Sequence, residues 1–169
     1  EEEENVSDYW VNTDDALENI DLSSGYGFES AIIQDVWVSP DGDDSNSGLT
    51  EDEAFSTIGY ALSRVYATEN NPITINLTSG EFSPDSTGEL FPIIMLSHIN
   101  LNGIDEELTI LDAQETNRVI LLENNYGNIF SNMTVKNGYS NADTYYSSGG
   151  GIFSLYSDLN LQNIIIRDN

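Results

Sequence analysis

The chain of 169 residues is long enough for one folded domain, and its 38% hydrophobic content is ordinary for a globular or solenoid protein. It contains no cysteine, which excludes disulfide bonds, thiolate metal sites and cysteine nucleophiles. Thirty acidic residues against four basic ones give a net charge of −26. Such a chain repels phosphate groups, so we exclude nucleic acid as a partner.

The acidic residues are concentrated at the start of the chain. Seventeen of the thirty lie within residues 1–53, and the first basic residue is Arg64. Residues 1–30 show no apolar period, which predicts an acidic arm that is flexible or docked on a partner. No run of eighteen apolar residues occurs, so no transmembrane segment is predicted. The acidic start is unlike a signal peptide, so an exported protein would be present here in its mature form.

A strand and a helix are predicted next. Residues 31–39 have a strand-forming centre, Val36-Trp37-Val38, and end at a Ser-Pro-Asp-Gly turn. Residues about 51–68 predict an amphipathic helix, because Phe55, Ile58, Leu62 and Val65 follow a helical spacing. Thr50 followed by Glu53 fits a capping box at its start. With one apolar face, this helix is expected to cap a larger structure.

From Pro72 onward the helical period gives way to short apolar runs separated by Gly, Asn, Asp and Ser. These predict eight strands at residues 73–77, 92–96, 99–101, 108–111, 119–122, 129–135, 152–156 and 159–166. The runs are nearly continuous in Ile, Leu and Val. That composition favours stacked parallel strands over hairpins with one wet face.

An internal repeat supports the stacked arrangement. Residues 132–138 align with residues 163–169 at an offset of 31, and the same offset places Leu122 over Phe153 and Phe130 over Leu161. In a coil stacked on itself, equivalent apolar side chains form internal columns, and Asn side chains can form hydrogen-bonded ladders. The repeat therefore predicts one domain over residues 31–169.

The order of these pieces resembles the pectate-lyase-like superfamily of right-handed parallel β-helices. The resemblance covers residues 32–169 and is closest to the N-terminal region of secreted bacterial and archaeal surface proteins. The pieces that carry it are residues 36–48 (VWVSPDGDDSNSG), the helix at 54–68, the coil segments 73–82, 91–94, 99–103 and 108–113, and the glycine step 149–153. It implies an all-β, right-handed parallel β-helix (a solenoid) with one N-terminal capping helix, in an extracellular setting. It implies no particular reaction, because this fold carries lyases, hydrolases, adhesins and inert stalks.

One turn offers candidate ligands for a hard cation. Asp41, Asp43, Asp44 and Ser45 place oxygen atoms close together in the sequence, as calcium requires. The spacing departs from the helix-loop-helix calcium pattern. The alternative is an acidic surface turn, and a cation here would stiffen the loop instead of catalysing a reaction.

Candidate catalytic groups are sparse. A lyase of this fold, by the resemblance, would need a basic side chain, and Lys136 and Arg167 occupy equivalent repeat positions that could form a basic stripe. A hydrolase would need aligned carboxylates. The candidates are Asp112, Asp143, Asp158 and Asp168. None of them forms a recognisable motif, so no catalytic residue is assigned, and the one histidine, His98, is predicted to be structural.

Aromatic residues in the loop at 138–151 are the other candidate contact surface. Tyr139, Tyr145 and Tyr146 could stack on sugar rings or bind a partner, or the loop could simply cover the solenoid flank. Three N-glycosylation sequons begin at Asn5, Asn76 and Asn132.

The function predicted from these features is an extracellular structural or adhesive module on the cell surface. The strand at 159–166 would expose an open coil, through which the module could self-associate into a filament or surface layer or bind other surface proteins. The alternatives are a carbohydrate-active enzyme acting on polysaccharide and a non-catalytic carbohydrate-binding module.

Overall fold

The computed structural model describes residues 31–140 and 149–169. In chain order their elements are β1 (Val36–Val38), the 3-10 helix η3 (Glu51–Glu53), α2 (Ile58–Arg64), β2 (Ile73–Leu77), β3 (Gly80–Phe82), β4 (Ile93–Ile94), β5 (Ile99–Asn102), β6 (Thr109–Asp112), β7 (Ile120–Glu123), β8 (Asn128–Lys136), β9 (Ile152–Leu155) and β10 (Leu159–Arg167). No helix in these ranges has the length and apolar character needed to cross a membrane.

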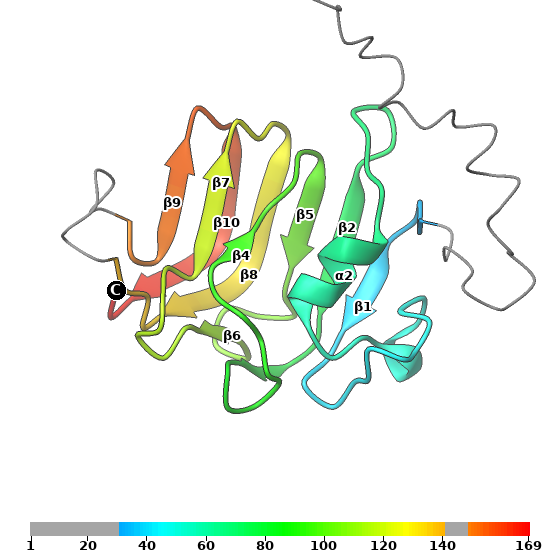
Figure 1. Cartoon of the computed structure of the whole chain (residues 1–169), viewed down its shortest axis with the longest axis horizontal. Coiled ribbons are helices and arrows are strands. Elements are labelled where there is room, and N and C mark those ends of the chain that lie inside the picture. Colours follow the sequence, from blue (N-terminus) through cyan, green and yellow to red (C-terminus); the bar gives the residue numbers. More distant parts are fainter. Residues whose placement is uncertain (1–30, 141–148) are drawn as a thin grey trace, which may run out of the picture. The chain divides into compact units, whose positions relative to one another are not determined.

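The strands form three faces of a coil, and every pairing between them is parallel. One face holds β1, β2, β5 and the first halves of β8 and β10, and a second holds β3, β6 and the second halves of β8 and β10. The third holds β4, β7 and β9. The chain visits the faces in turn, so successive coils lie side by side (Figure 1). The parallel β-helix predicted from the sequence is therefore confirmed, and a right-handed sense is the one that nearly all parallel crossovers adopt.

Apolar side chains inside the coil form columns that run from one coil to the next. Val36 pairs with Ile75, Ile75 with Leu101, and Leu101 with Phe130. All four are fully buried. Each such burial contributes about 1.5–3 kcal/mol. Because the side chains alternate in and out along each strand, a shift of one residue would expose the whole column, and this fixes the register.

An asparagine ladder runs along the corner between the first and second faces. Asn163 Nδ2 donates to Asn132 Oδ1 (2.9 Å), Asn132 Nδ2 donates to Asn102 Oδ1 (3.0 Å), and Asn102 Nδ2 donates to Asn76 Oδ1 (3.4 Å). Asn132 and Asn163 take left-handed backbone angles (φ 58° and 50°), which bend the strands at this corner. Asn76 and Asn132, two of the sequon residues, are thus rungs of the ladder.

The predicted repeat is confirmed over β8 and β10. Met133 pairs with Ile164, Val135 with Ile166, and Phe130 with Leu161.

The predicted placement of Leu122 over Phe153 is wrong, because Phe153 pairs with Leu121 instead. The turn after β9, residues 156–158, is one residue shorter than the turn after β7, residues 124–127, so the offset differs between the two sides of this corner.

The predicted helix at about 51–68 is wrong in its extent. The α-helix covers only Ile58–Arg64, and Glu51–Glu53 form a separate 3-10 turn. Between them Phe55 makes a parallel bridge with Val38, and its amide donates to the carbonyl of Trp37 (2.9 Å). The apolar spacing suggested one helix because Phe55 points into the same core from an extended backbone.

The predicted capping box is also wrong, since Thr50 makes no side-chain cap. The Thr57 hydroxyl accepts from the amide of Tyr60 (3.1 Å), and the carboxylate of Glu89 accepts from the amides of Ile58 (2.6 Å) and Gly59 (3.0 Å). Burial raises the pKa of the Glu89 carboxyl, although these hydrogen bonds oppose the shift. A carboxylate from thirty residues further along the chain thus caps α2.

Two further strands differ from the prediction, one in its length and one because it was not predicted. The first strand is limited to Val36–Val38, and β3 was not predicted because its three residues begin with Gly80 and include one large apolar side chain. Gly80 has φ 131°, and a Cβ there would meet the ring of Pro40, so the position requires glycine.

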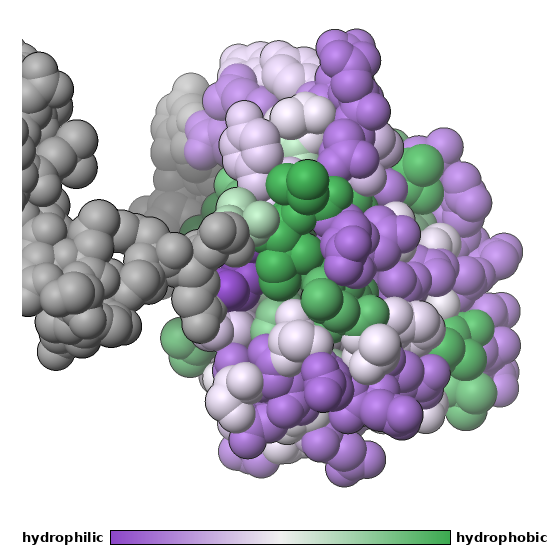
Figure 2. All heavy atoms as spheres, turned by 90° about the vertical axis from the view of Figure 1, so that its right-hand side faces the viewer, coloured by the Kyte–Doolittle hydropathy of each residue, from purple (hydrophilic) through white to green (hydrophobic). Residues whose placement is uncertain are grey.

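The end of the coil that carries β1 and α2 is largely hydrophilic around a small hydrophobic patch (Figure 2). The parallel bridge between Ile32 and Val65 lies beside α2, and the neighbouring Ile33 and Tyr66 are exposed. Isolated apolar side chains of this kind are normal on protein surfaces.

Replacing the central rung of the ladder, Asn102→Ala, is expected to lower the free energy of unfolding by about 2–3 kcal/mol. The change removes hydrogen bonds to Asn76, Asn132 and Ser131 while leaving the apolar columns in place. Urea denaturation followed by circular dichroism measures the effect. The matched control is Asn160→Ala on the exposed part of β10, which is expected to change stability by less than about 0.5 kcal/mol. Equal effects of the two changes would show that the ladder adds nothing.

Candidate functional site

Lys136 lies at the centre of a charged cluster on the second face of the coil. Its Nζ contacts Asp112 Oδ2 at 2.9 Å and Glu81 Oε2 at 3.0 Å. The other oxygen of Asp112 accepts from Asn137 Nδ2 (2.8 Å) and from the amide of Gln114 (2.9 Å). The cluster joins β3, β6 and β8, three strands that are neighbours only because the coils stack.

The charges in this cluster hold both partners in their ionised forms. Hydrogen bonding to Asp112 raises the pKa of Lys136 above its ordinary value. Burial opposes ionisation of Asp112, but the hydrogen bond from Lys136 and those from Gln114 and Asn137 outweigh it, so the pKa of Asp112 is lowered. A general base needs a lysine with a depressed pKa, and a general acid needs a carboxyl with a raised one. The cluster is therefore suited to holding coils together and is poorly suited to proton transfer.

The backbone positions of Lys136 and Arg167 pair as the repeat predicts, but their side chains do not form the expected basic stripe. Arg167 pairs with Lys136 across β10 and β8, but its guanidinium contacts Asp168 (2.8 Å) at the exposed end of β10. Lys136 and Arg167 each face carboxylates, so the stripe presents little free positive charge. Of the carboxylates considered for hydrolysis, Asp112 is in the Lys136 cluster, Asp168 is paired with Arg167, and Asp143 lies outside the described residues.

The turn predicted to bind calcium is built largely from its own hydrogen bonds. Asp43 Oδ1 accepts from the amide of Ser45 (2.8 Å), which lowers the pKa of Asp43. Asp44 turns toward the start of α2, where Oδ1 accepts from the amide of Ser56 (2.8 Å) and Oδ2 from the hydroxyl of Thr57 (3.0 Å). A Cβ at Gly42, beside Asp41, would collide with the carbonyl of Phe55, so the turn requires glycine for this close approach.

Within residues 31–140 and 149–169, no three or more Asp, Glu, His or Cys side chains gather where one metal ion could bind them. Calcium binding by Asp41, Asp43, Asp44 and Ser45 stays a prediction.

The aromatic loop is only partly described. Tyr139 is exposed and its amide donates to the carbonyl of Asn117 (2.9 Å), whereas Tyr145 and Tyr146 lie outside the described residues. A contact role for these three tyrosines stays a prediction. His98 lies in the turn before β5 with φ 63°, where its amide donates to the carbonyl of Tyr126 (2.8 Å) and its carbonyl accepts from Ile73. These contacts agree with the structural role predicted for it.

The outer surface of the first face carries a shallow polar groove. It is lined by Asp35, Thr74, Asn76, Asn100, Asn102, Ile129 and Ser131. Two of these side chains replace strand hydrogen bonds, because Asp35 Oδ1 accepts from the amide of Thr74 (2.7 Å) and Asn100 Oδ1 accepts from the amide of Ile129 (2.9 Å). The groove is mainly neutral amide and hydroxyl, a surface that suits contact with polar ligands and offers no activated nucleophile.

Exposed apolar side chains also lie on β10. Its inward-facing Leu161 and Ile166 continue the columns of Phe130 and Val135, which are fully buried, yet Leu161 is 43% and Ile166 48% exposed. Among the described strands β10 pairs with β8 alone, and no other described strand lies on its second edge. An open strand edge above exposed apolar side chains is a template for a further strand.

The sequence did not reveal two polar side chains that the structure places inside the coil. Glu89 caps α2, and Asn128 lies at an inward position of β8 with Phe130 two residues later. The alternation of β8 could have identified Asn128, since a polar residue in the inward set of a strand is unusual. Nothing near Glu89 in the sequence connects it with α2.

Replacing Lys136 with Met is expected to lower the free energy of unfolding by about 2–4 kcal/mol at neutral pH, because the Asp112 carboxylate loses its buried counter-charge. The pKa of Asp112 lies below its ordinary value of 3.8, so this contribution is present above pH 3.8 and is lost as the pH falls through the folded-state pKa. Urea denaturation between neutral pH and about pH 2.5 should show the difference between the two proteins shrinking on acidification.

The matched control is Arg167→Met, which breaks an exposed ion pair and should cost less than about 1 kcal/mol. A Lys136→Met effect that stayed constant down to the acid limit would contradict the ion-pair explanation.

Residues 40–109, less than half of the chain, match a family model described as "Protein of unknown function (DUF1565)". Among curated proteins, none is similar enough in sequence to count as a relative. A crystal structure of a pectin methylesterase mutant in complex with a hexasaccharide is similar over 76% of this chain, with 14% identity and a TM-score of 0.47, and the chain spans 42% of that protein's length. The strand register by itself gives the fold, a parallel β-helix.

Proposed function

We propose that this chain supplies a structural or adhesive β-helix module to an extracellular surface protein, and that two copies associate through β10. The observation that carries the proposal is the surface of β10. Among the described strands β10 pairs with β8 alone, and its inward-facing Leu161 and Ile166 are exposed.

A second β10 is a suitable occupant for this surface. It offers the same unpaired backbone and the same apolar side chains, so a two-fold axis brings complementary groups together. Two-fold symmetry makes the contact antiparallel, with β10 of one copy against β10 of the other. Burial of Leu161 and Ile166 in such a contact would contribute about 1 kcal/mol or more for each side chain.

The end of the coil at β1 favours a pair of molecules over a filament, because its strand edge is already occupied. A filament of stacked coils needs a second open edge, on β1. There the amide of Trp37 donates to Gly48 (2.8 Å) and its carbonyl accepts from Phe55 (2.9 Å), so the chain's own loop occupies that edge. Head-to-tail stacking on β1 would have to displace this loop.

The net charge sets how such a pair responds to salt. Two copies with a charge of −26 each repel one another, and added salt screens that repulsion. Association is therefore expected to strengthen as the ionic strength rises. An association held by ion pairs would weaken instead.

The substitutions Leu161→Asn and Ile166→Asn place polar groups in the proposed interface between the two β10 strands. They leave the fully buried columns intact. Each is expected to weaken dimerisation about tenfold or more, equivalent to about 1.4 kcal/mol. Sedimentation equilibrium of the 169-residue chain at several salt concentrations measures the effect. The matched control is Ile94→Asn, an exposed apolar residue on β4, which should leave dimerisation unchanged.

Two results would overturn the proposal. One is a chain that stays monomeric at high concentration and high salt. The other is a dimer that Leu161→Asn and Ile166→Asn leave intact, since such a dimer would use another surface.

A carbohydrate-active enzyme, or a non-catalytic carbohydrate-binding module, is the competing proposal, and it draws less support. Lys136, a candidate base for a lyase, has a raised pKa and is held between two carboxylates. Asp112, a candidate for hydrolysis, is held ionised by the same cluster. The polar groove at Asn100 could contact a neutral glycan, but it brings together no acid and base pair.

A further inference from the structure

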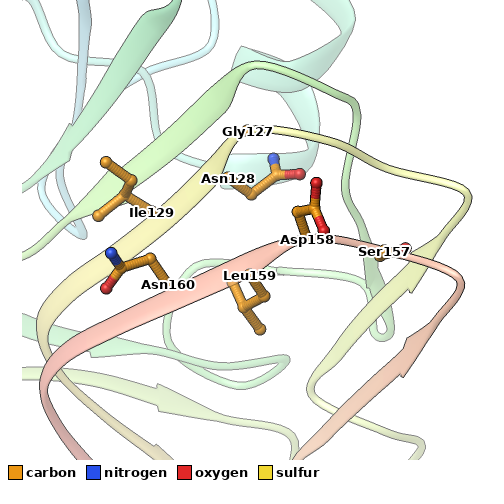
Figure 3. A pocket seen from close by; sticks show the side chains of 7 residues that line it. All are labelled: Gly127, Asn128, Ile129, Ser157, Asp158, Leu159 and Asn160. Atoms are coloured by element: carbon orange, nitrogen blue, oxygen red, sulfur yellow. The ribbon is translucent and has the colours of Figure 1, made fainter.

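A hollow lies at the corner where the coil of β8 meets the coil of β10. It has a volume of about 490 Å³ and is lined by Gly127, Asn128, Ile129, Ser157, Asp158, Leu159 and Asn160 (Figure 3). At this corner the turn before β10, residues 156–158, has one residue fewer than the turn before β8, residues 124–127.

Asn128, one of the lining residues, carries a buried and unsatisfied oxygen. The residue is 2% exposed, and Asn128 Oδ1 has no hydrogen-bond partner in the protein. Its Nδ2 donates to the carbonyls of Leu96 (2.8 Å) and Ile99 (2.7 Å). These two acceptors fix the orientation of the amide, because a flipped side chain would set its oxygen against two carbonyl oxygens. A buried acceptor without a donor costs about 1–3 kcal/mol, so a partner is expected.

The Asp158 carboxylate reaches the same space from the other coil. Figure 3 shows one of its oxygens directed toward the amide of Asn128. The hydroxyl of Ser157 is already engaged, since it accepts from the amide of Asn125 (2.9 Å) and donates to the carbonyl of Leu155 (2.9 Å). No Lys, Arg or His is among the residues that line the hollow. The two side-chain groups that face one another across the corner, the amide oxygen of Asn128 and the carboxylate of Asp158, are therefore both acceptors, whereas the Asn160 oxygen accepts from Gln162.

We propose that this hollow binds a hard divalent cation, calcium, between Asn128 Oδ1 and the Asp158 carboxylate. Amide and carboxylate oxygens are ligands that calcium prefers, and the hollow has room for the water molecules that complete its six to eight ligands. Two protein side chains give a weak site, with a dissociation constant on the order of 10⁻⁴–10⁻³ M, a range typical of extracellular modules. The strongly negative chain raises the local concentration of cations around it.

The site would connect two coils. Asn128 belongs to β8 and Asp158 directly precedes β10, so the cation links successive levels of the stack at a corner where the turn is short. Binding would therefore stabilise the coil of β10 most. The proposal is independent of self-association through β10 and differs from the predicted calcium turn at Asp41–Ser45.

Terbium luminescence tests the site, because Tb³⁺ replaces calcium and a nearby excited tyrosine sensitises its emission. Tyr126 and Tyr156 are exposed residues in the two turns that form the corner. Titration of the 169-residue chain with Tb³⁺ should give saturable emission that calcium displaces. Asp158→Asn, an exposed position that should not disturb folding, is expected to weaken the binding of Tb³⁺ and calcium about tenfold or more.

Two control variants separate this site from general attraction to the acidic chain. Glu107→Gln removes the same charge from an exposed position in the turn between β5 and β6 and should leave the affinity unchanged. Asp43→Asn tests the turn at 41–45 and should also leave it unchanged. Calcium should raise the unfolding temperature of the unaltered chain and of both controls more than that of Asp158→Asn.

Three outcomes would overturn the proposal. Equal loss of affinity in Asp158→Asn and Glu107→Gln would show diffuse attraction only. Loss in Asp43→Asn alone would place the ion in the acidic turn. An absence of saturable binding by Tb³⁺ and calcium would leave water as the partner of Asn128.

Discussion

The structure depends on the vertical register between successive coils. Each inward side chain lies over its equivalent in the previous coil, as Ile75, Leu101 and Phe130 do, and the same register brings Asn76, Asn102 and Asn132 close enough to form a ladder. The apolar columns supply most of the stabilisation, because they remove large side chains from water. The ladder adds directional bonds that a shifted register would break. The two sets of contacts therefore select one register together.

Charge is distributed so that it does not oppose this stacking. The chain has only four basic residues, and one of them, Lys136, lies between carboxylates from two other strands. Most of the remaining outward positions of the first face are neutral amides and hydroxyls, as in Thr74 and Asn100. Like charges on neighbouring coils would lie within about 5 Å of one another and would repel strongly. Neutral outward side chains avoid that repulsion in a chain with a large net negative charge.

Much of the fold could be predicted from the sequence, because each strand after Pro72 carries its own apolar run. The predicted strands at 73–77 and 159–166 agree with β2 and β10 to within one residue. The limits of the helix could not be predicted in this way. Apolar spacing does not distinguish a helical Phe55 from an extended one that points into the same core, and the bridge from Phe55 to Val38 is a contact between distant residues.

The candidate sites were less predictable, since they are made by residues that the coiling brings together. Lys136 was recognised as a cation in a repeat, but its partners Glu81 and Asp112 lie on other coils, and they turn a candidate base into a structural ion pair. The polar outer groove likewise joins residues from three strands, β2, β5 and β8, with Asp35 just before β1. Sequence indicated which side chains face outward, and only the register between coils shows which of them meet.

The corners are where such a fold can change without losing its core. The faces must keep the alternation of inward side chains, so an insertion or deletion within a face would turn a column outward. A corner has no such requirement, and the shorter turn after β9 leaves both flanking faces in parallel register. Polar groups also enter the interior at corners: Asn125 and Asn128 there bond to carbonyls of the previous coil, Met95 and Ile99 among them. A corner can therefore vary in length and hold polar groups while the columns beneath it remain packed. In a solenoid of this kind, chemistry is therefore expected to arise at its corners, where the chain is free to vary and polar groups are already held in place.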